Sequence, residues 1–209
     1  GYPYICWLVS GIIPWFFFSD ALPSASNCLL EYGWECNRED LKANSTKIFD
    51  SYLKNGFTEA GFFKESVNYD KNFEDPVHSI RRQSEGLYAI FHFLAYEKEK
   101  GRKHPEWEQR LKNMLNMFLQ LQNADGSFPR KFRDDFSIVD KSGGSTPSAT
   151  LPLVMGYKYF KDKRYLDSAK RTADYLEKEL ISKADYFSST LDANCEDKEA
   201  SLYAATATY

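Results

Sequence analysis

The sequence lacks the features that mark metal, redox and nucleic-acid-binding proteins. Its four cysteines are spaced neither as a zinc ribbon nor as a Cys-x-x-Cys pair, and its three histidines include no His-x-x-x-His pair. The 27 Lys and Arg residues are balanced by 30 Asp and Glu residues, giving a formal charge of -3, so a nucleic-acid-binding face is not expected. There is no glycine-rich phosphate loop and no Gly-x-Ser-x-Gly sequence. We therefore expect no metal and no organic cofactor.

Two further points concern individual cysteine and histidine residues. A disulfide between Cys28 and Cys36 is possible on spacing, although free cysteines are the favoured interpretation. His92 lies in an apolar segment and is expected to be a core histidine whose ring finds a hydrogen-bond partner, not a ligand.

Hydrophobic runs long enough to cross a membrane are also missing. The most apolar segment is Tyr4 to Phe18, about fifteen residues interrupted by Pro14, whereas a spanning helix needs about 20. It has no basic segment before it, as a signal peptide would. The chain turns polar after Gly33, and nothing beyond that point could span a bilayer.

The amino-acid sequence of this first segment resembles that of the membrane domain of polysaccharide-export permeases of the ABC-transporter class. The resemblance is carried by residues 11–22 and 27–32 and covers residues 1–33. We expect residues 1–33 to be a foreign piece joined to an unrelated domain; the alternative is a native anchor or apolar cover. A membrane partner is expected only if residues 1–33 are a genuine anchor.

What the sequence does contain is a repeat. Apolar helices begin at Ser84, Ser148 and Glu199, roughly 64 and 51 residues apart, and amphipathic helices alternate with them. A helix that is apolar on all sides must be surrounded, whereas an amphipathic helix can face water. The predicted inner helices are 83–97, 151–160 and 196–209, and the predicted outer helices are 39–54, 106–122 and 163–180, with 55–80 as a long loop.

Inner helices ringed by outer helices form an α/α toroid. We therefore predict an all-α fold for residues 34–209: a partial α/α toroid, about half of a six-hairpin ring, preceded by the apolar N-terminal segment. Because the third inner helix ends without a cap or a stop signal, the ring is expected to be truncated.

Aromatic residues make up 16% of the chain, and many lie between the predicted helices. Aromatic loops over a concave site suit flat, partly apolar ligands such as sugar rings, but such residues can equally pin a loop to the core. Both interpretations stay open at this point for this set: Phe57, Phe62, Phe63, Tyr69, Phe73, Phe128, Phe132, Phe136, Tyr186 and Phe187.

Three sequence segments, at residues 121–130, 145–150 and 190–200, resemble segments of the six-hairpin glycosidase-like proteins. These proteins are (α/α)6 toroids that are frequent among carbohydrate-degrading bacteria. The resemblance covers residues 34–209 and is more specific for the fold than for any enzyme family. It implies a sugar site at one mouth of the ring, formed by the loops that lead into the inner helices. It also favours a periplasmic, cell-surface or secreted location and an oligo- or polysaccharide partner.

Mapped onto this chain, the resemblance gives a set of candidate residues. Glycoside hydrolysis needs two carboxyl groups that flank the scissile bond. The first candidates are Asp192 and Asp197, and Glu85 and Asp125 could supply the opposing group. The candidate substrate-binding residues are Arg81, Arg82, Phe128, Arg130, Ser148, Tyr186, Phe187 and Glu199.

Each candidate also has a purely structural interpretation. Glu196, Asp197 and Glu199 could be first-turn acids that stabilise a helix dipole, by about 0.3–1 kcal/mol each. Asp125 could be a turn residue before Gly126, and the arginines could pair with neighbouring acids.

The predicted function is hydrolysis of a polysaccharide through paired carboxylates. The alternatives are a polysaccharide lyase, a non-catalytic sugar-binding toroid and a component of a polysaccharide-export system.

Overall fold

The computed structural model describes residues 15–17, 21–68, 71–185 and 198–209. Within them the chain forms seven α-helices. A 3-10 helix, η1, leads into α6, and a short π-helix, η2, continues α7. The bounds are α2 (Ala21–Glu35), α3 (Glu39–Asn55), α4 (Ile80–Glu99), α5 (Pro105–Leu121), η1 (Gly143–Ala149), α6 (Thr150–Phe160), α7 (Lys163–Tyr175), η2 (Leu176–Ile181) and α8 (Lys198–Thr208).

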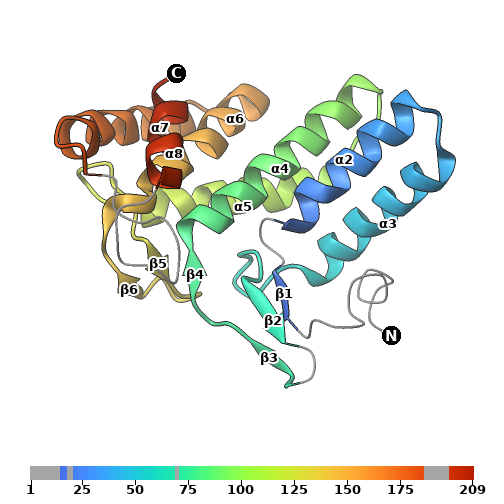
Figure 1. Cartoon of the computed structure of the whole chain (residues 1–209), viewed down its shortest axis with the longest axis horizontal. Helices are drawn as coiled ribbons and strands as arrows, with labels where there is room; N and C mark the ends of the chain where they lie inside the picture. Colours follow the sequence, from blue (N-terminus) through green and yellow to red (C-terminus); the bar gives the residue numbers. More distant parts are fainter. Residues whose placement is uncertain (1–14, 18–20, 69–70, 186–197) are drawn as a thin grey trace.

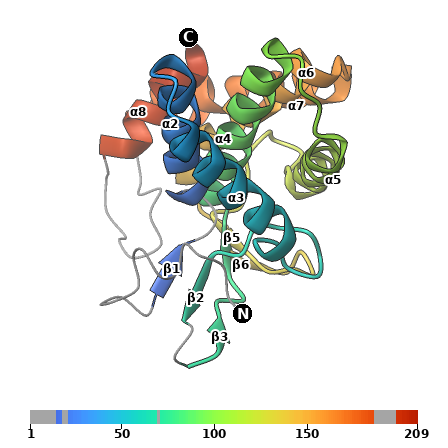
Figure 2. The same ribbon diagram turned by 90° about the vertical axis from the view of Figure 1, so that its right-hand side faces the viewer.

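The helices follow one another as inner and outer partners (Figures 1 and 2). Helix α4 packs against α2 on one side and α6 on the other, and α6 in turn contacts α8. Helices α3, α5 and α7 pack outside this inner row, against α2, α4 and α6. The predicted all-α fold, a partial α/α toroid built from helical hairpins, is confirmed.

The outer helix α5 shows how the sequence specifies such an element. Pro105 occupies its first turn, where a missing N–H costs nothing, and Glu106 and Glu108 lie at the positive end of the helix dipole. Its buried stripe recurs at helical spacing and includes Trp107, Leu111, Met114, Leu115, Phe118 and Leu121. Burying each large apolar side chain stabilises the fold by about 1.5–3 kcal/mol.

The turn between α6 and α7 is set by two adjacent residues. Lys161 takes a left-handed backbone conformation with φ 62°, which ends α6. Asp162 then caps α7, because its Oδ1 accepts a hydrogen bond from the backbone N–H of Arg164 at 3.0 Å. The predicted outer helix 163–180 is therefore present, with its last part in the π-helical turn η2.

The prediction of an unbroken loop over residues 55–80 is wrong, because three short strands lie there. Strand β2 (Ser66–Asn68) pairs antiparallel with β1 (Trp15–Phe17) and β3 (Phe73–Glu74). Strand β4 (His78–Ser79) pairs with β5 (Lys131–Phe132), which pairs with β6 (Ile138–Asp140). Both small sheets lie on the side of the molecule where α4 begins (Figure 1).

Most aromatic residues between the helices belong to the core. Phe62, Phe63, Phe128 and Phe132 are fully buried, and Phe63 stacks on Tyr52 of α3 with ring centroids 5.4 Å apart. Phe57 and Phe136 are partly buried against the same core, whereas Phe73 is 45% exposed. These side chains pin the connecting segments to the helices. Tyr69, Tyr186 and Phe187 lie outside the described residues.

Helix α2 runs continuously through the position where the sequence predicts a domain boundary, at residue 33. It is attached to the helices on both sides, because Ser45 Oγ donates to Ser26 O at 2.9 Å and Asn27 Nδ2 donates to Ala89 O at 2.7 Å. Cys28 and Cys36 are free thiols. The foreign origin of residues 1–33 remains a prediction about the gene.

None of the helices in the described part of the chain is long and apolar enough to cross a membrane.

The inner helix α4 is not apolar on every side. Arg81, Glu85 and His92 interrupt it on one face, and His92 is exposed, so its assignment as a core histidine is wrong. The physical reason is its position on the helix: His92 lies almost opposite the buried Leu87, Ile90 and Leu94.

Candidate functional site

The first turns of α4 hold the arginines and the carboxylate predicted for the sugar-binding mouth. Strand β4 leads directly into α4, and its position is fixed by pairing with β5. The backbone N–H of Ile80 also donates to Arg130 O at 3.2 Å. These contacts fix the beginning of α4 beside the chain segment that carries Arg130. They therefore also fix the backbone positions of Arg81, Arg82 and Glu85.

Glu85 links two inner helices. Its Oε1 accepts a hydrogen bond from the hydroxyl of Tyr203, which lies on α8. Arg81 lies one turn earlier on α4, with its Nε 3.9 Å from the same Oε1. The side chains of Arg81 and Glu85 are 14% and 25% exposed, so water reaches this pair only in part. A guanidinium and a phenolic hydroxyl both interact favourably with a neighbouring carboxylate.

Arg82 belongs to a second, deeper cluster around Glu65. The Glu65 side chain is fully buried, and Arg82 Nη1 lies 3.6 Å from its Oε1. Its Oε2 accepts hydrogen bonds from the Ser79 backbone N–H at 3.3 Å and from Gln83 Nε2 at 3.2 Å. A buried charge is tolerated only when it is paired and hydrogen-bonded, and these contacts meet that need. Glu65 was not predicted from the sequence, where nothing distinguishes it from a surface acid.

Arg130 forms the third pair, with Asp140 at the end of β6. Its side chain is 3% exposed, and its Nη1 lies 3.3 Å from Asp140 Oδ2. Burial raises the pKa of Asp140, but a hydrogen bond from the Ser142 backbone N–H and the charge of Arg130 outweigh it, so the pKa lies below its usual value. Asp140 was also not predicted, because only the pairing of β5 with β6 brings it beside Arg130.

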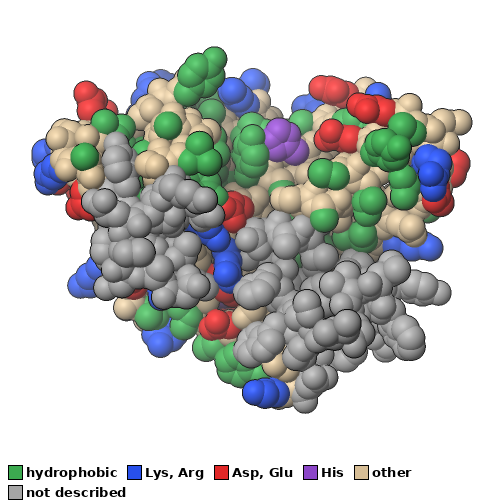
Figure 3. Space-filling model, in the orientation of Figure 1, with side chains coloured by type: hydrophobic (Ala, Val, Ile, Leu, Met, Phe, Trp, Pro, Cys, Tyr) green, Lys and Arg blue, Asp and Glu red, His purple; other side chains and the backbone are tan. Residues whose placement is uncertain are grey.

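These three pairs form one charged cluster at the beginning of α4. Ser79 and Ile80, the two residues before Arg81, bond to Glu65 and Arg130 respectively. Figure 3 shows acidic and basic side chains in the middle of this face of the molecule. Glu65 and Arg130 are buried, whereas Arg81, Arg82, Glu85 and Asp140 are partly exposed. Guanidinium groups only donate hydrogen bonds and ionised carboxylates only accept them, so the partly exposed groups offer both kinds of partner to a polar ligand.

Ser148 and Phe128 do not face solvent in this structure. Ser148 is 2% exposed, and its hydroxyl donates to Ser145 O within η1 at 2.7 Å. Phe128 is fully buried against Phe118, and its backbone N–H and carbonyl both bond to the hydroxyl of Thr146. Both residues stabilise the segment that leads into α6, and neither side chain is exposed enough to contact a ligand in this structure.

Asp125 occupies a tight turn away from the charged cluster. Its Oδ1 accepts hydrogen bonds from the Ser127 hydroxyl at 2.7 Å and the Ser127 backbone N–H at 3.0 Å. These bonds, the side-chain one foremost, lower the pKa of Asp125. Gly126 follows with φ +92°. The contacts are those of a turn residue.

Four of the predicted residues, Tyr186, Phe187, Asp192 and Asp197, lie outside the described residues. Glu199 is the second residue of α8, the helix that also carries Tyr203. Tyr203 could have been suspected from the sequence, because it lies one helical turn after Glu199 on a predicted inner helix.

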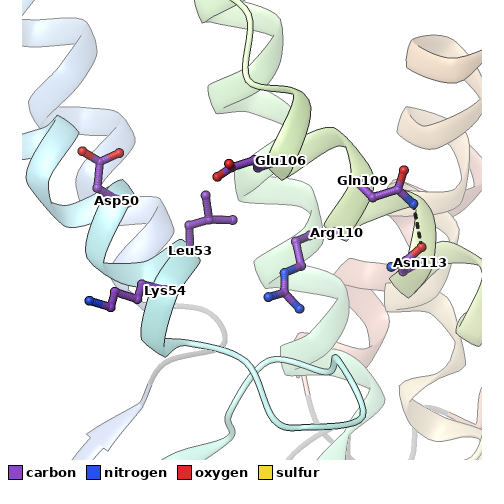
Figure 4. Close-up of a pocket in the computed structure, with 7 residues that line it drawn as sticks. All are labelled: Asp50, Leu53, Lys54, Glu106, Gln109, Arg110 and Asn113. Carbon is purple, nitrogen blue, oxygen red and sulfur yellow. Dashed lines mark hydrogen bonds between the residues drawn. The ribbon is translucent and has the colours of Figure 1, made fainter.

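Two further hollows lie elsewhere on the surface. One, of about 650 Å³, separates α3 from α5 and is lined by Asp50, Leu53, Lys54, Glu106, Gln109, Arg110 and Asn113 (Figure 4). Two of its polar side chains contact neighbouring protein groups. Gln109 Nε2 donates a hydrogen bond to Asn113 Oδ1 at 2.9 Å, and the guanidinium of Arg110 lies over the ring of Phe57.

The other hollow, of about 450 Å³, lies between the C-terminal parts of α4 and α6. It is lined by Phe91, Ala95, Lys98, Glu99, Met155, Lys158 and Tyr159. Lys98 and Lys158 are last-turn residues that complement the helix dipoles, and Tyr159 donates to Glu108 at 2.7 Å. None of the ion pairs in the described part of the chain joins two residues that line either hollow, whereas the cluster at α4 contains three such pairs.

No profile of a known protein family matches the chain. Solved structures of two sugar-converting enzymes are among those that share its fold. Cellobiose 2-epimerase from Bacillus thermoamylovorans B4167 aligns with a TM-score of 0.61 at 17% identity, over 73% of this chain and 39% of the epimerase. D-mannose isomerase aligns with a TM-score of 0.59 at 12% identity, over 81% of this chain and 45% of the isomerase. The chain thus spans less than half the length of either protein, and at these identities the likeness establishes the fold.

Proposed function

We propose that this chain is part of a carbohydrate-active enzyme whose sugar binds at the beginning of α4. The observation that carries the proposal is the convergence of Arg81, Glu85 and Tyr203 beside the Arg82–Glu65 and Arg130–Asp140 pairs. Sugar hydroxyls both donate and accept hydrogen bonds, so alternating guanidinium and carboxylate groups are complementary to them. The two structural neighbours described above, an epimerase and an isomerase of sugars, support the same substrate class.

The described side chains favour proton transfer next to a sugar carbonyl, as in isomerisation or epimerisation. An ionised carboxylate can remove the proton from the carbon beside the carbonyl, which leaves an enediolate. It can return the proton to the neighbouring carbon, which isomerises the sugar, or to the opposite face of the same carbon after the enediolate has turned, which epimerises it. In this proposal Glu85 is that base. Arg81 and the hydroxyl of Tyr203 stabilise the negative charge that develops on the carbonyl oxygen.

Hydrolysis through paired carboxylates is the second candidate. It is favoured by the acids that precede α8, since Asp192 and Asp197 precede the helix that carries Tyr203, the partner of Glu85. In that mechanism one carboxyl group protonates the leaving oxygen and the other acts as base or nucleophile. Glu85, which lies beside Arg81 and the hydroxyl of Tyr203, would take the second role.

The decisive experiment follows the fate of the proton. The gene product that contains this chain is incubated in deuterium oxide with glucose, mannose and cellobiose, and NMR detects deuterium at the carbon beside the carbonyl together with any new isomer. Oligosaccharides are tested in parallel for new reducing ends. Isomerisation predicts deuterium incorporation without chain cleavage, and hydrolysis predicts the reverse.

Residue roles are tested by Glu85→Gln and Tyr203→Phe. Loss of a positioned general base lowers the rate by about 10²–10⁴-fold, so Glu85→Gln should reduce turnover at least 100-fold. Glu99→Gln, an exposed acid on the same helix, is the matched control and should leave turnover unchanged. Sugar binding that persists without any turnover in the wild type would instead indicate a binding protein. An unaltered rate in Glu85→Gln would remove Glu85 from the mechanism.

A further inference from the structure

The polar residues of α4 continue beyond Glu85 as a stripe along the helix. Arg81, Glu85, Tyr88 and His92 recur at intervals of four, three and four residues, so their side chains lie on one face. Tyr88 is partly exposed and His92 is exposed, although α4 is flanked by inner helices on two sides. An inner helix that served only to fill the core would have buried apolar residues at these positions.

The direction of this stripe follows from what surrounds the helix. The opposite face of α4 is closed, because Leu87, Ile90 and Leu94 are at most 1% exposed. Helices α2 and α6 occupy the flanks, and Asn27 of α2 bonds to the carbonyl of Ala89. The stripe therefore faces away from the buried side of α4.

Tyr88 and His92 are arranged as a pair on this face. Their ring centroids are 4.5 Å apart and their planes meet at 79°, so the edge of one ring meets the face of the other. Among the described residues, no hydrogen bond or ion pair joins the imidazole of His92 or the hydroxyl of Tyr88 to a neighbour. Apolar ring surface beside polar ring atoms is the kind of surface that contacts a sugar, through its C–H face and its hydroxyls.

We infer that Tyr88 and His92 form a second sugar subsite, so that the site accepts a substrate of at least two linked sugar units. Seven residues of helix separate Glu85 from His92, a rise of about 10 Å, which leaves room for a second ring beyond the one at Glu85. The first ring lies against Arg81 and Glu85, and the second lies against the Tyr88–His92 pair. The inference rests on the proposed function and deepens it by naming a disaccharide or longer chain as the substrate class.

The test compares one sugar unit with two. Glucose, mannose, cellobiose and maltose are titrated by calorimetry into the gene product that contains this chain. The same titrations are repeated with His92→Ala, with Tyr88→Leu and with Gln109→Ala, an exposed control on the outer helix α5. The subsite predicts that wild type binds a disaccharide more tightly than a monosaccharide. It also predicts that His92→Ala and Tyr88→Leu each weaken the disaccharide about tenfold while monosaccharide binding stays unchanged.

Each other outcome has a distinct meaning. Equal binding of disaccharide by wild type and both variants, with sugar binding still lost in Arg81→Ala, overturns the subsite and leaves the proposed function standing. No binding of any sugar by the folded wild type overturns both. Because His92 is exposed, His92→Ala is expected to fold normally, and a circular dichroism melt of each variant checks this.

Discussion

Replacing Glu97 with glutamine should destabilise the protein at neutral pH and have little effect near pH 2. Glu97 is the 4% exposed carboxylate near the end of α4, where it holds the turn to α5. Its Oε2 accepts hydrogen bonds from Arg102 Nε at 2.7 Å and from His104 Nε2 at 2.9 Å, and its Oε1 accepts one from Arg102 Nη2 at 2.5 Å. Burial raises the pKa of Glu97, but these bonds outweigh it and lower the pKa from 4.5 to about 2.

The magnitude follows from linkage between proton binding and folding. At about 1.36 kcal/mol per pKa unit, this lowering corresponds to about 3 kcal/mol. Arg102 and His104 are 34% and 31% exposed, and water screens the pair, so we expect about 2–3 kcal/mol. The folded-state pKa lies below the unfolded one. The contribution is therefore complete above about pH 4.5 and disappears as the pH falls through about 2, with roughly half remaining at pH 3.

Urea denaturation followed by tryptophan fluorescence measures this directly, since Trp107 is buried in α5. The free energy of unfolding of Glu97→Gln should fall below that of wild type by about 2–3 kcal/mol at pH 7, and the difference should shrink to about 1 kcal/mol at pH 3. Glu99→Gln on the exposed face of the same helix should stay within about 0.5 kcal/mol of wild type. A difference for Glu97→Gln that is the same at both pH values would refute the reasoning.

Three further predictions concern the loop between α5 and β5. Gly126→Ala should destabilise the fold by more than Gly101→Ala. Both glycines have positive φ, +92° and +77°, but a Cβ at Gly126 would collide with the backbone carbonyl of Arg171, whereas a Cβ at Gly101 meets nothing within 4 Å. Thermal melts should show about 1–2 kcal/mol for Gly101→Ala, and equal losses would contradict the collision. Phe128→Ala should cost about 3–5 kcal/mol through the cavity it leaves, while the milder Phe128→Leu should retain sugar affinity; a large rise in Kd with normal stability would instead make Phe128 a ligand contact. Asp125→Asn keeps the Oδ1 acceptor of the turn and should turn over substrate within about twofold of wild type, while Asp125→Ala should lose about 1 kcal/mol of stability; a 100-fold slower Asp125→Asn would make that carboxylate catalytic.

The sequence could bring candidate residues together where they belong to one helix. Arg81, Arg82 and Glu85 lie at the start of a strongly apolar segment, and their spacing alone places them in its first turns. Their partners could not be found in this way. Glu65, Asp140 and Tyr203 are remote in sequence and reach the arginines and Glu85 only through the β2, β6 and α8 positions of the folded chain.

The burial of Phe128 and His92 also could not be predicted from their positions in the sequence. The sequence places Phe128 in a loop, where it could contact a ligand or pin the loop to the core, and His92 in an apolar helix, which suggested a buried histidine. In the folded chain Phe128 is fully buried and His92 is exposed. Burial depends on which neighbours cover a residue, and the neighbours here come from other hairpins.

The sequence by itself determined the alternation of inner and outer helices, because the periodicity of apolar residues records whether a helix has one covered face or several. It also determined the ends of helices such as α5 and α7, where local groups satisfy the free N–H donors and complement the helix dipole. Only the tertiary structure decided which charges meet at the beginning of α4 and which face of α4 stays exposed. Ion pairs and concave surfaces arise from contacts between distant segments, and a linear pattern carries no distance between them.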